Sequence, residues 1–303
     1  MKPRIAIPLG DPKGIGPEVV AAALAAPGVT DLLEPVLFGD PALLRAPHVA
    51  DCSEAAAARA AADALHCAVD AVIAGQADAL CTAPLNKAAL VDLDGGPFMG
   101  QTGYLGYRFQ GTPLMTFVAD RLRAGLLTVH IPVAEVARLL AEIGVTGIVR
   151  RIAIFSRGLQ DDLGVQRPRI AVLGLNPHAG EDGLIGSEET RLLRPAIEEA
   201  RRAGFDVTGP WPADGHFANI GRGQIDHDGT LACYHDQALC GFKALTPRGG
   251  VQLTLGLRAI RTSCQHGTAR DLAGKGAADA SSMLAALRLA AEIAQRRHAA
   301  HPT

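Results

Sequence analysis

Short apolar runs alternate with longer segments of helical periodicity along the whole chain, and this alternation is the feature that most restricts its fold. Runs that predict buried strands lie at residues 5–9, 36–38, 79–82, 115–118, 126–129, 170–173 and 231–234. Segments that predict helices lie at residues 16–26, 54–65, 133–143, 147–163, 187–203 and 279–297. Because alternating strands and helices build layers around a sheet, the sequence predicts a layered α/β fold.

One helix start carries a capping signal. Ser187 stands before Glu188 and Glu189 at the start of the segment 187–203. A serine hydroxyl can accept a hydrogen bond from the first turn of a helix, and acidic residues there suit the positive end of the helix dipole. We therefore expect Ser187 to cap this helix.

Length and composition are those of an ordinary soluble globular protein. The 303 residues exceed the usual size of one domain, so we expect two lobes. The formal net charge is −2 and no run of Lys and Arg is present, which gives no reason to bind nucleic acid or an anionic membrane. The six scattered cysteines include no CxxC pair, and the N-terminal residues do not read as a signal peptide, so we expect a cytoplasmic protein with reduced thiols and a small-molecule substrate.

Two glycine-rich loops are candidates for ligand contact. The first, GDPKGIGPE at residues 10–18, follows a strand and opens a helix, so it is either a loop shaped for close ligand approach or a plain strand-to-helix turn. It lacks the GxGxxG pattern, and a Rossmann fold is not implied. The second, QHGTARDLAGKGAAD at residues 265–279, would let a flat base lie on its backbone, with His266 and Asp279 at the polar edges. A structural turn is the alternative reading.

Three histidines each follow an apolar, strand-like run: His130, His178 and His235. Ligands of α/β proteins bind at the ends of the strands. Three neutral imidazoles that met at one point would suit a divalent metal such as Zn²⁺ and would leave positions open for substrate oxygens. Their separations are too long for a local motif, so packed or surface histidines remain the alternative.

Four charged residues complete the candidate site. Asp236, beside His235, and Asp214 could orient metal-bound imidazoles or carry protons, or they could be ordinary loop carboxylates. Lys243 and Arg261 could anchor a carboxylate or phosphate of the substrate, or they could be solvated surface charges.

Taken together, these segments resemble the 4-hydroxythreonine-4-phosphate dehydrogenase family, PdxA. The motifs that carry the resemblance occur in the family's order over essentially the whole chain: GDPKGIGPE, TAPLNKAAL, GLNPHAGEDG, PADG, YHDQAL, TLGL with IRTS, and HGTARDLAGKGAAD. The first and last motifs also look like those of isocitrate and isopropylmalate dehydrogenases. The resemblance thus implies an NAD- or NADP-dependent oxidative decarboxylase that acts on a CH–OH group.

The resemblance also implies an architecture. It implies a two-lobed α/β/α subunit of the isocitrate/isopropylmalate dehydrogenase type, with the active site in the cleft between the lobes. The cofactor-side lobe would comprise residues 1–125 plus 245–303, and residues 126–244 would form the lobe for metal binding and dimerisation. An obligate homodimer would hold the metal, zinc or alternatively Mg, Mn or Co, with His130 and His178 of one subunit and His235 of the other.

Further site residues carry over from the family to matching positions. The resemblance implies that NAD(P) contacts His266, Gly267, Thr268, Ala269 and Asp279. It implies that the substrate contacts Thr102, Lys243 and Arg261.

Two departures from the family pattern leave the substrate open. Gln101-Thr102-Gly103 stands where the family reads His-Thr-Glu, and Gln252 stands where the family has Asn. Gln101 and Gln252 both lie among the substrate-binding positions. The candidates are 4-hydroxythreonine 4-phosphate, threonate or erythronate 4-phosphate, and a carboxylated cis-dihydrodiol of the terephthalate type.

The resulting hypothesis is oxidation of a hydroxyl group beta to a carboxylate, followed by loss of CO₂. The metal would bind the substrate hydroxyl and NAD(P)⁺ would accept the hydride. Asp236, Lys243 and Asp214 are the candidate proton carriers. The rival hypothesis, motivated by Gln101 and Gln252, is a paralogue that binds metal and metabolite without turnover.

Overall fold

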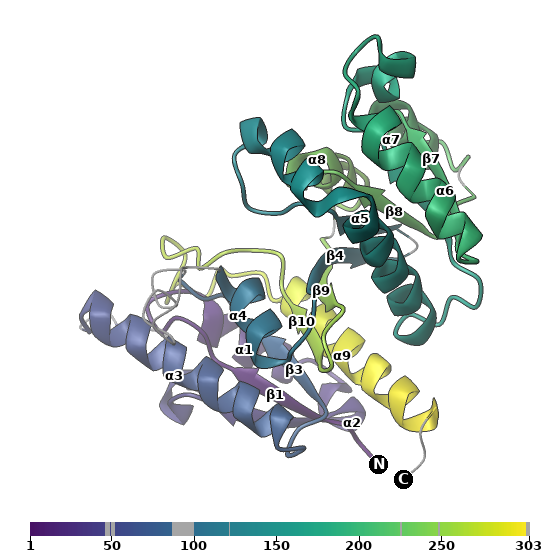
Figure 1. Cartoon of the computed structure of the whole chain (residues 1–303). Helices are drawn as coiled ribbons and strands as arrows, with labels where there is room; N and C mark the ends of the chain where they lie inside the picture. Colours follow the sequence, from purple (N-terminus) through teal and green to yellow (C-terminus); the bar gives the residue numbers. More distant parts are fainter. Residues whose placement is uncertain are drawn as a thin grey trace. The chain divides into compact units, whose positions relative to one another are not determined.

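The structure of the chain is a computed structural model (Figure 1), which describes residues 1–45, 49, 52–86, 100–120, 122–224, 226–247 and 249–300. It divides into two compact units, one of residues 1–113 and 248–303 and one of residues 114–247, which we call unit 1 and unit 2. The motif TAPLNKAAL is described up to Asn86, and residues 87–90 of it lie outside the described residues. No helix in the described ranges has the length and apolar character needed to cross a bilayer.

Unit 1 is built on a mixed sheet. Its strands are β1 (Arg4–Pro8), β2 (Glu34–Phe38), β3 (Ala79–Thr82), β9 (Val251–Leu255) and β10 (Ile260–Ser263). They are ordered β2-β1-β3-β10-β9, parallel except for β9, which pairs antiparallel with β10. The carboxyl ends of β1, β2, β3 and β10 therefore share one edge of the sheet, and both glycine-rich loops start there.

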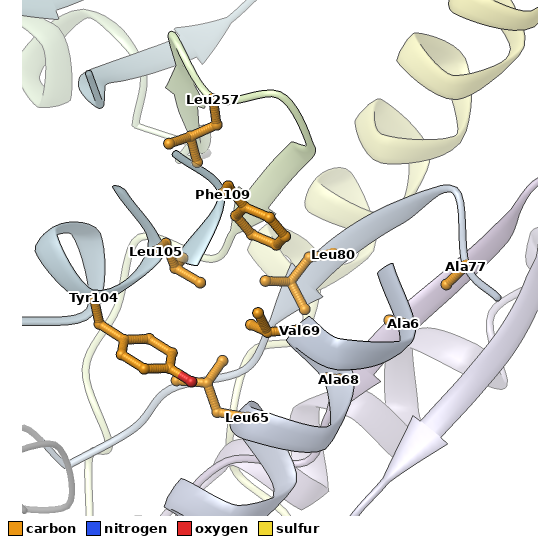
Figure 2. Close-up of a cluster of buried hydrophobic side chains, with 10 residues drawn as sticks. All are labelled: Ala6, Leu65, Ala68, Val69, Ala77, Leu80, Tyr104, Leu105, Phe109 and Leu257. Atoms are coloured by element: carbon orange, nitrogen blue, oxygen red, sulfur yellow. The ribbon is translucent and has the colours of Figure 1, made fainter. Parts of the chain in front are cut away.

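Helices pack on both faces of this sheet. They are α1 (Gly16–Leu24), α2 (Val29–Leu32), η1 (Pro41–Leu44), α3 (Glu54–Ile73), α4 (Gly100–Arg108) and α9 (Ser281–Ala300). The alanine-rich α3 suits a helix because Ala loses little side-chain entropy, and its N-terminus is capped by the Ser53 hydroxyl, which accepts from the backbone N–H of Ala56. Figure 2 shows how Leu65 and Val69 of α3 meet Leu105 and Phe109 from the α4 side over Leu80 of β3.

Unit 2 contains five further strands of the sheet, in parallel and antiparallel pairs. Its strands are β4 (Leu114–Ala119), β5 (Leu122–Leu126), β6 (Arg169–Leu173), β7 (Asp206–Trp211) and β8 (Gly229–Ala232). They are ordered β4-β5-β8-β6-β7. β4 and β5 form an antiparallel pair, whereas β5, β8, β6 and β7 are parallel to one another. Four carboxyl ends thus share one edge of this sheet.

Helices also cover the sheet of unit 2. They are η3 (Val133–Glu135), α5 (Val136–Asp161), η4 (Pro177–Gly183), η5 (Glu189–Leu193), α6 (Arg194–Arg202), α7 (Ala213–Gly221) and α8 (His235–Leu245). Phe155 of α5 lies so close to β5 and β8 that a Cβ on Gly229 would approach its ring to 2.7 Å. Glycine is therefore required where α5 packs on the sheet. Phe242 of α8 and Phe217 of α7 pack with Met115 and Phe117 of β4.

The predicted α/β class is confirmed, with local corrections. The strand expected at residues 126–129 is wrong, because β5 ends at Leu126 and begins earlier, where Leu122 pairs with Ala119 across the β4–β5 hairpin. The helices expected at 133–143 and 147–163 are joined as α5, interrupted at Gly144 by a φ of 64° and a ψ of 175°. That non-helical glycine lies in the gap between the two predictions.

The expected cap at Ser187 is also wrong. The residues after it begin with the π-helical turn η5, and no side-chain cap is found at its start. The backbone N–H of Ser187 instead donates to Glu188 Oε2, and Glu189 is buried at 1% exposure rather than lying on the surface. The divisions between the units, at 113/114 and 247/248, differ from the expected 125/126 and 244/245 because β4 pairs with β5 and so belongs to unit 2.

Unit 2 holds a buried histidine, His216, next to a half-buried one, His227, beside β7 and β8. His216 is 6% exposed and its Nε2 lies 2.8 Å from Thr230 Oγ1, while its ring centroid lies 5.8 Å from that of His227. His227 Nε2 lies 2.8 Å from Thr208 Oγ1. Burial lowers the pKa of His216 to about 4, and the nearby His227 adds to the shift. Burial also lowers the pKa of His227.

Unit 2 is therefore expected to lose stability as the pH falls from about 6.5 towards 4. In that window the unfolded chain binds a proton at His216 and the folded chain does not, which costs about 3 kcal/mol of unfolding free energy at pH 4 relative to pH 7. Urea denaturation across this range measures the loss. His216→Gln, whose amide can still donate to Thr230, should flatten the profile; a variant as steep as wild type would contradict the assignment.

Candidate active site

Candidate residues gather along the carboxyl edge of the sheet in unit 2. His130 follows β5, His235 begins α8 after β8, His178 follows β6, and Asp214 lies in the first turn of α7 after β7. Because β5, β8 and β6 are neighbours in the sheet and parallel, the three histidines come from three adjacent strand ends. Sequence separation alone does not predict this adjacency.

His130 and His235 lie close together. Their ring centroids are 5.6 Å apart, and with Asp236 they line a cavity of about 160 Å³. His235 Nδ1 lies 2.6 Å from Asp236 Oδ1. A carboxylate at this distance favours the tautomer with the proton on Nδ1, which directs the Nε2 lone pair towards a ligand. Asp236 is thus placed to orient the imidazole of His235.

His178 lines a second cavity, of about 640 Å³, together with Asp214 and Asp236. Asp236 and Tyr234 line both cavities, so the two adjoin at the start of α8. The structure therefore places all five of the predicted polar residues His130, His178, His235, Asp214 and Asp236 around two neighbouring hollows of one unit. Lys243 lies exposed in the last turn of α8.

The backbone that carries His178 is left-handed. Residues 178–182 have φ values of 54°, 52°, 77°, 41° and 55° in order, and of these residues one, Gly180, is a glycine. A left-handed conformation costs roughly 1–2 kcal/mol for each non-glycine residue. Such strain persists where surrounding contacts impose it, and it is typical of functional loops.

Hydrogen bonds tie the loops of this edge together. Gln237 accepts from the backbone N–H of Cys233 at 2.7 Å and donates through Nε2 to the carbonyl of Gly174 at 2.6 Å. Thr128 Oγ1 donates to the carbonyl of Cys233 at 2.7 Å. The Gln237 side chain thus joins the loop after β6 to the loop after β8. The Thr128 hydroxyl joins the loop after β5 to the loop after β8.

The donor set suits a divalent metal, but the described part of one chain does not complete a metal site. Histidine nitrogens with a carboxylate-oriented imidazole are the chemistry that zinc prefers. Among the described residues, no group of three or more His, Cys, Asp and Glu side chains is placed to hold a metal ion. His130 and His178 are both exposed.

In unit 1 the central feature is a buried arginine. Arg261 of β10 is 1% exposed, and its Nη1 and Nη2 groups donate to neutral oxygens. The acceptors are Gln252 Oε1 at 2.7 Å, Thr254 Oγ1 at 3.1 Å, Thr82 Oγ1 at 2.9 Å and Gln101 Oε1 at 2.8 Å. Its Nε is buried without a partner, and no carboxylate pairs with it in the described residues. Burial lowers the pKa of Arg261 to about 10.

This arrangement brings three sequence-predicted substrate residues into one network. Gln101 and Gln252, the two departures from the family pattern, both turn their side-chain oxygens to the Arg261 guanidinium. Thr102 lies beside Gln101 in α4. A buried cation that lacks an anionic partner is costly unless a ligand supplies the charge. A carboxylate or phosphate is the kind of group that would neutralise this charge.

The two glycine-rich loops of unit 1 pack against each other. Asp11, 1% exposed, accepts from Arg270 Nη2 at 2.8 Å and from the backbone N–H of Lys13 at 2.9 Å. Glu54 bridges Arg270 and Lys13 at 2.6 and 2.9 Å. The Ile15 N–H donates to the Thr268 carbonyl at 2.9 Å. The first loop therefore supports the second.

The second loop has features that fit a nucleotide. His266 Nε2 and Gln265 Nε2 are buried without hydrogen-bond partners, and a Cβ on Gly267 would meet nothing within 4 Å. Asp279 Oδ1 accepts from the backbone N–H of Ser281 at 2.8 Å, which lowers the pKa of Asp279, and the nearby His266 adds to this. A buried imidazole nitrogen and a buried amide NH₂ group without partners are features that the hydroxyls of a ribose or the edge of an adenine would satisfy. Ala269 has a φ of 37°.

Several residues that support the site were not predicted. They are Asn176, Glu189, Gln237, Asp11, Arg270 and Thr82. All except Glu189 lie inside the motifs that carry the family resemblance, so membership of a motif is the signal that could have identified them. Glu189 follows its motif by six residues, and no local pattern distinguishes it from a helix-start glutamate.

Comparison with known proteins places the chain in a family. Residues 32–290 match the family described as "Pyridoxal phosphate biosynthetic protein PdxA". The chain is 42% identical to the 4-hydroxythreonine-4-phosphate dehydrogenase of Paracoccus denitrificans, with 95% of this chain and 89% of the relative covered. It is 40% identical to the D-threonate 4-phosphate dehydrogenase of Cupriavidus necator, with 97% of this chain and 98% of the relative covered.

A solved structure agrees with these relatives. The crystal structure of 4-hydroxythreonine-4-phosphate dehydrogenase from Klebsiella pneumoniae superposes with a TM-score of 0.81 at 34% identity, covering 97% of this chain and 99% of that one. The family's matched residues span both units of the fold and include the strand ends that precede His130, His178 and His235. This chain is therefore a member of the PdxA family of dehydrogenases.

Proposed function

We propose that the chain is an NAD(P)-dependent and divalent-metal-dependent dehydrogenase that oxidises a hydroxyl group beta to a carboxylate, with 4-hydroxythreonine 4-phosphate as the substrate. The observation that carries the proposal is the position of His130, His178 and His235 at three adjacent strand ends. They occupy these positions in a chain 42% identical to a relative of that name. The product keto acid would then lose CO₂ to give an aminoketone phosphate.

The residues of the chain would have three roles: to orient a metal ligand, to bind the substrate and to transfer protons. When bound, the metal supplies Lewis acidity at the substrate hydroxyl and the later ketone, and the nicotinamide supplies a hydride acceptor. Asp236 orients the imidazole of His235. Arg261 and the amides of Gln101 and Gln252 bind an anionic group of the substrate. Asp236, Asp214 and Lys243 are the candidates to remove the hydroxyl proton and to return a proton to carbon after CO₂ leaves.

The proposal includes a homodimer in which the metal is shared. His130 and His178 are exposed, and a single described chain offers two histidines near each other rather than three. A second copy that supplied His235 would complete the ligand set. We assign unit 2 to metal binding and dimerisation, and unit 1 to the cofactor, in a subunit of the isocitrate dehydrogenase type. The buried free thiols Cys81, Cys233 and Cys264 suit a reducing cytoplasm.

The cofactor is assigned to His266, Gly267, Thr268, Ala269 and Asp279. The loop that carries them depends on Asp11 through Arg270. Asp11→Asn is expected to raise the KM for NAD(P)⁺ by roughly tenfold, because a neutral amide cannot hold the guanidinium and the loop loses order. The kcat should change by less than about twofold. Steady-state kinetics measure both, with the exposed Asp31→Asn as the matched control; an unchanged cofactor KM would contradict the assignment.

One assay tests the proposed substrate. NADH or NADPH formation by the zinc-loaded protein is measured with 4-hydroxythreonine 4-phosphate, D-threonate 4-phosphate and a carboxylated cis-dihydrodiol. Turnover of the first at the highest kcat/KM supports the proposal. Preference for another would move the assignment to that substrate, and metal and ligand binding without reduced cofactor would support the non-catalytic rival.

Threonate 4-phosphate is the second candidate because two observations favour it. The relative named D-threonate 4-phosphate dehydrogenase is 40% identical to this chain, and the relative named 4-hydroxythreonine-4-phosphate dehydrogenase is 42% identical. Gln101 and Gln252 also both contact Arg261 in place of the family's His and Asn. Gln101→His with Gln252→Asn should shift the kcat/KM ratio towards 4-hydroxythreonine 4-phosphate if these amides select the substrate.

A further inference from the structure

We propose that Glu189 is a positioning residue that sets the place of His178 through Asn176. The inference rests on the proposed function in one respect, namely that His178 is a metal ligand. Glu189 itself is buried behind the turn that carries His178 and lies 1% exposed, so it acts through the backbone rather than as a ligand.

The turn needs support from outside its own sequence. Residues 178–182 are consecutively left-handed, and His178, Ala179, Glu181 and Asp182 have side chains that disfavour this conformation. Within the turn, hydrogen bonds run from Ala179 N–H to the Asn176 carbonyl and from Ile185 N–H to the Gly180 carbonyl. The first of these makes the start of the turn depend on where Asn176 is held.

The Glu189 carboxyl group holds Asn176 at two points. Its Oε1 accepts from the backbone N–H of Asn176 at 2.7 Å, and its Oε2 accepts from Asn176 Nδ2 at 2.9 Å. Glu188 Oε2 accepts from the same Nδ2 at 2.8 Å. Two carboxyl groups on one amide nitrogen fix which way the Asn176 side chain faces.

The same carboxyl group also fills the space beneath the turn. A Cβ on Gly180 would lie 2.5 Å from Glu189 Oε2, and a Cβ on Gly174 would lie 3.3 Å from Oε1. Glu189 thus contacts the turn at Gly180 and the end of the strand region at Gly174. Displacement of this side chain would release both sides of the turn on which His178 stands.

Glu189→Gln tests this role with little change in volume. The new NH₂ group would face either the N–H or the Nδ2 of Asn176, so a donor would meet a donor. Asn176 cannot relieve this by turning its amide over, because its oxygen would then face Glu188. Residues behind a metal ligand typically change metal affinity by about tenfold to a hundredfold.

The experiment measures Zn²⁺ affinity by chelator competition and amide exchange of residues 176–185 in the metal-free protein. Glu189→Gln is expected to bind Zn²⁺ at least about tenfold more weakly and to exchange faster in this segment. Glu198→Gln, which removes an exposed charge from the neighbouring α6, should match wild type in both. Circular dichroism checks that each variant is folded. If Glu189→Gln does not fold, the same two measurements are made on Glu189→Asp, whose shorter side chain should also loosen the hold on Asn176.

The outcomes separate this inference from the proposed function. Wild-type Zn²⁺ affinity or wild-type exchange in Glu189→Gln would overturn the positioning role. Unchanged Zn²⁺ binding in His178→Ala would instead overturn the proposed ligand set. In that case the exchange data alone would decide whether Glu189 holds the turn.

Discussion

Replacing His178 by alanine is expected to remove tightly bound divalent metal and to lower kcat/KM by about a thousandfold or more. A metal that acts as a Lewis acid contributes several kcal/mol to the transition state, and about 1.4 kcal/mol corresponds to each factor of ten. His178 is exposed and lies on a turn rather than in the core, so the fold should remain intact. Metal content by mass spectrometry and steady-state kinetics measure the two effects.

The control is His298→Ala, which removes an exposed histidine of α9 in unit 1. This variant should keep both metal and turnover. Full metal content together with wild-type turnover in His178→Ala would remove this histidine from the ligand set. Loss of turnover with metal retained would make it a substrate contact instead.

Arg261→Met is expected to weaken substrate binding by at least about a hundredfold while leaving the unfolding free energy within about 1 kcal/mol of wild type. The loss follows because hydrogen bonds to a charged group contribute about 1.5–3 kcal/mol each. Stability should survive because the buried guanidinium has no carboxylate partner in the described chain and its pKa is lowered to about 10, so its charge is a cost to folding.

In Arg261→Met, the side chains that accept hydrogen bonds from Arg261 in the wild type can find other partners. Gln252 Oε1 keeps its hydrogen bond from Ser263 Oγ at 2.8 Å, and the hydroxyls of Thr82 and Thr254 can rotate. Urea denaturation and substrate KM measure the two quantities separately. Arg288→Met on the exposed face of α9 is the control and should alter neither. A large loss of stability with an unchanged KM would make Arg261 a structural residue.

Much of the fold could be predicted because it follows from local patterns. The apolar run at β3 is bounded by Asp78 and Pro84, and the structure places its strand at the expected residues 79–82. The strand β5 was misplaced because its residues include Arg123 and Gly125, whereas the apolar residues that follow it read as a better strand. Only pairing with β4 and β8 identifies the true segment.

The candidate site could be predicted as a set of residues but not as an arrangement. The strand-end rule places His130, His178 and His235 at one edge, and this agrees with the structure. The left-handed turn at His178 has no sequence signature, because four of its five residues disfavour that conformation. It depends on Glu189, a contact that sequence spacing does not reveal.

The order of the chain has a consequence for how the protein is made. Unit 2 is one continuous segment, residues 114–247, whereas unit 1 is split around it. In unit 1, β3 pairs with β10, whose residues 260–263 are synthesised after all of unit 2. During synthesis β3 can pair with β1 at once, but every strand of unit 2 emerges before β3 can meet β10. Arg261 lies on β10, so its hydrogen bonds to Thr82 and Gln101 form only after the strands that precede the three histidines have been made.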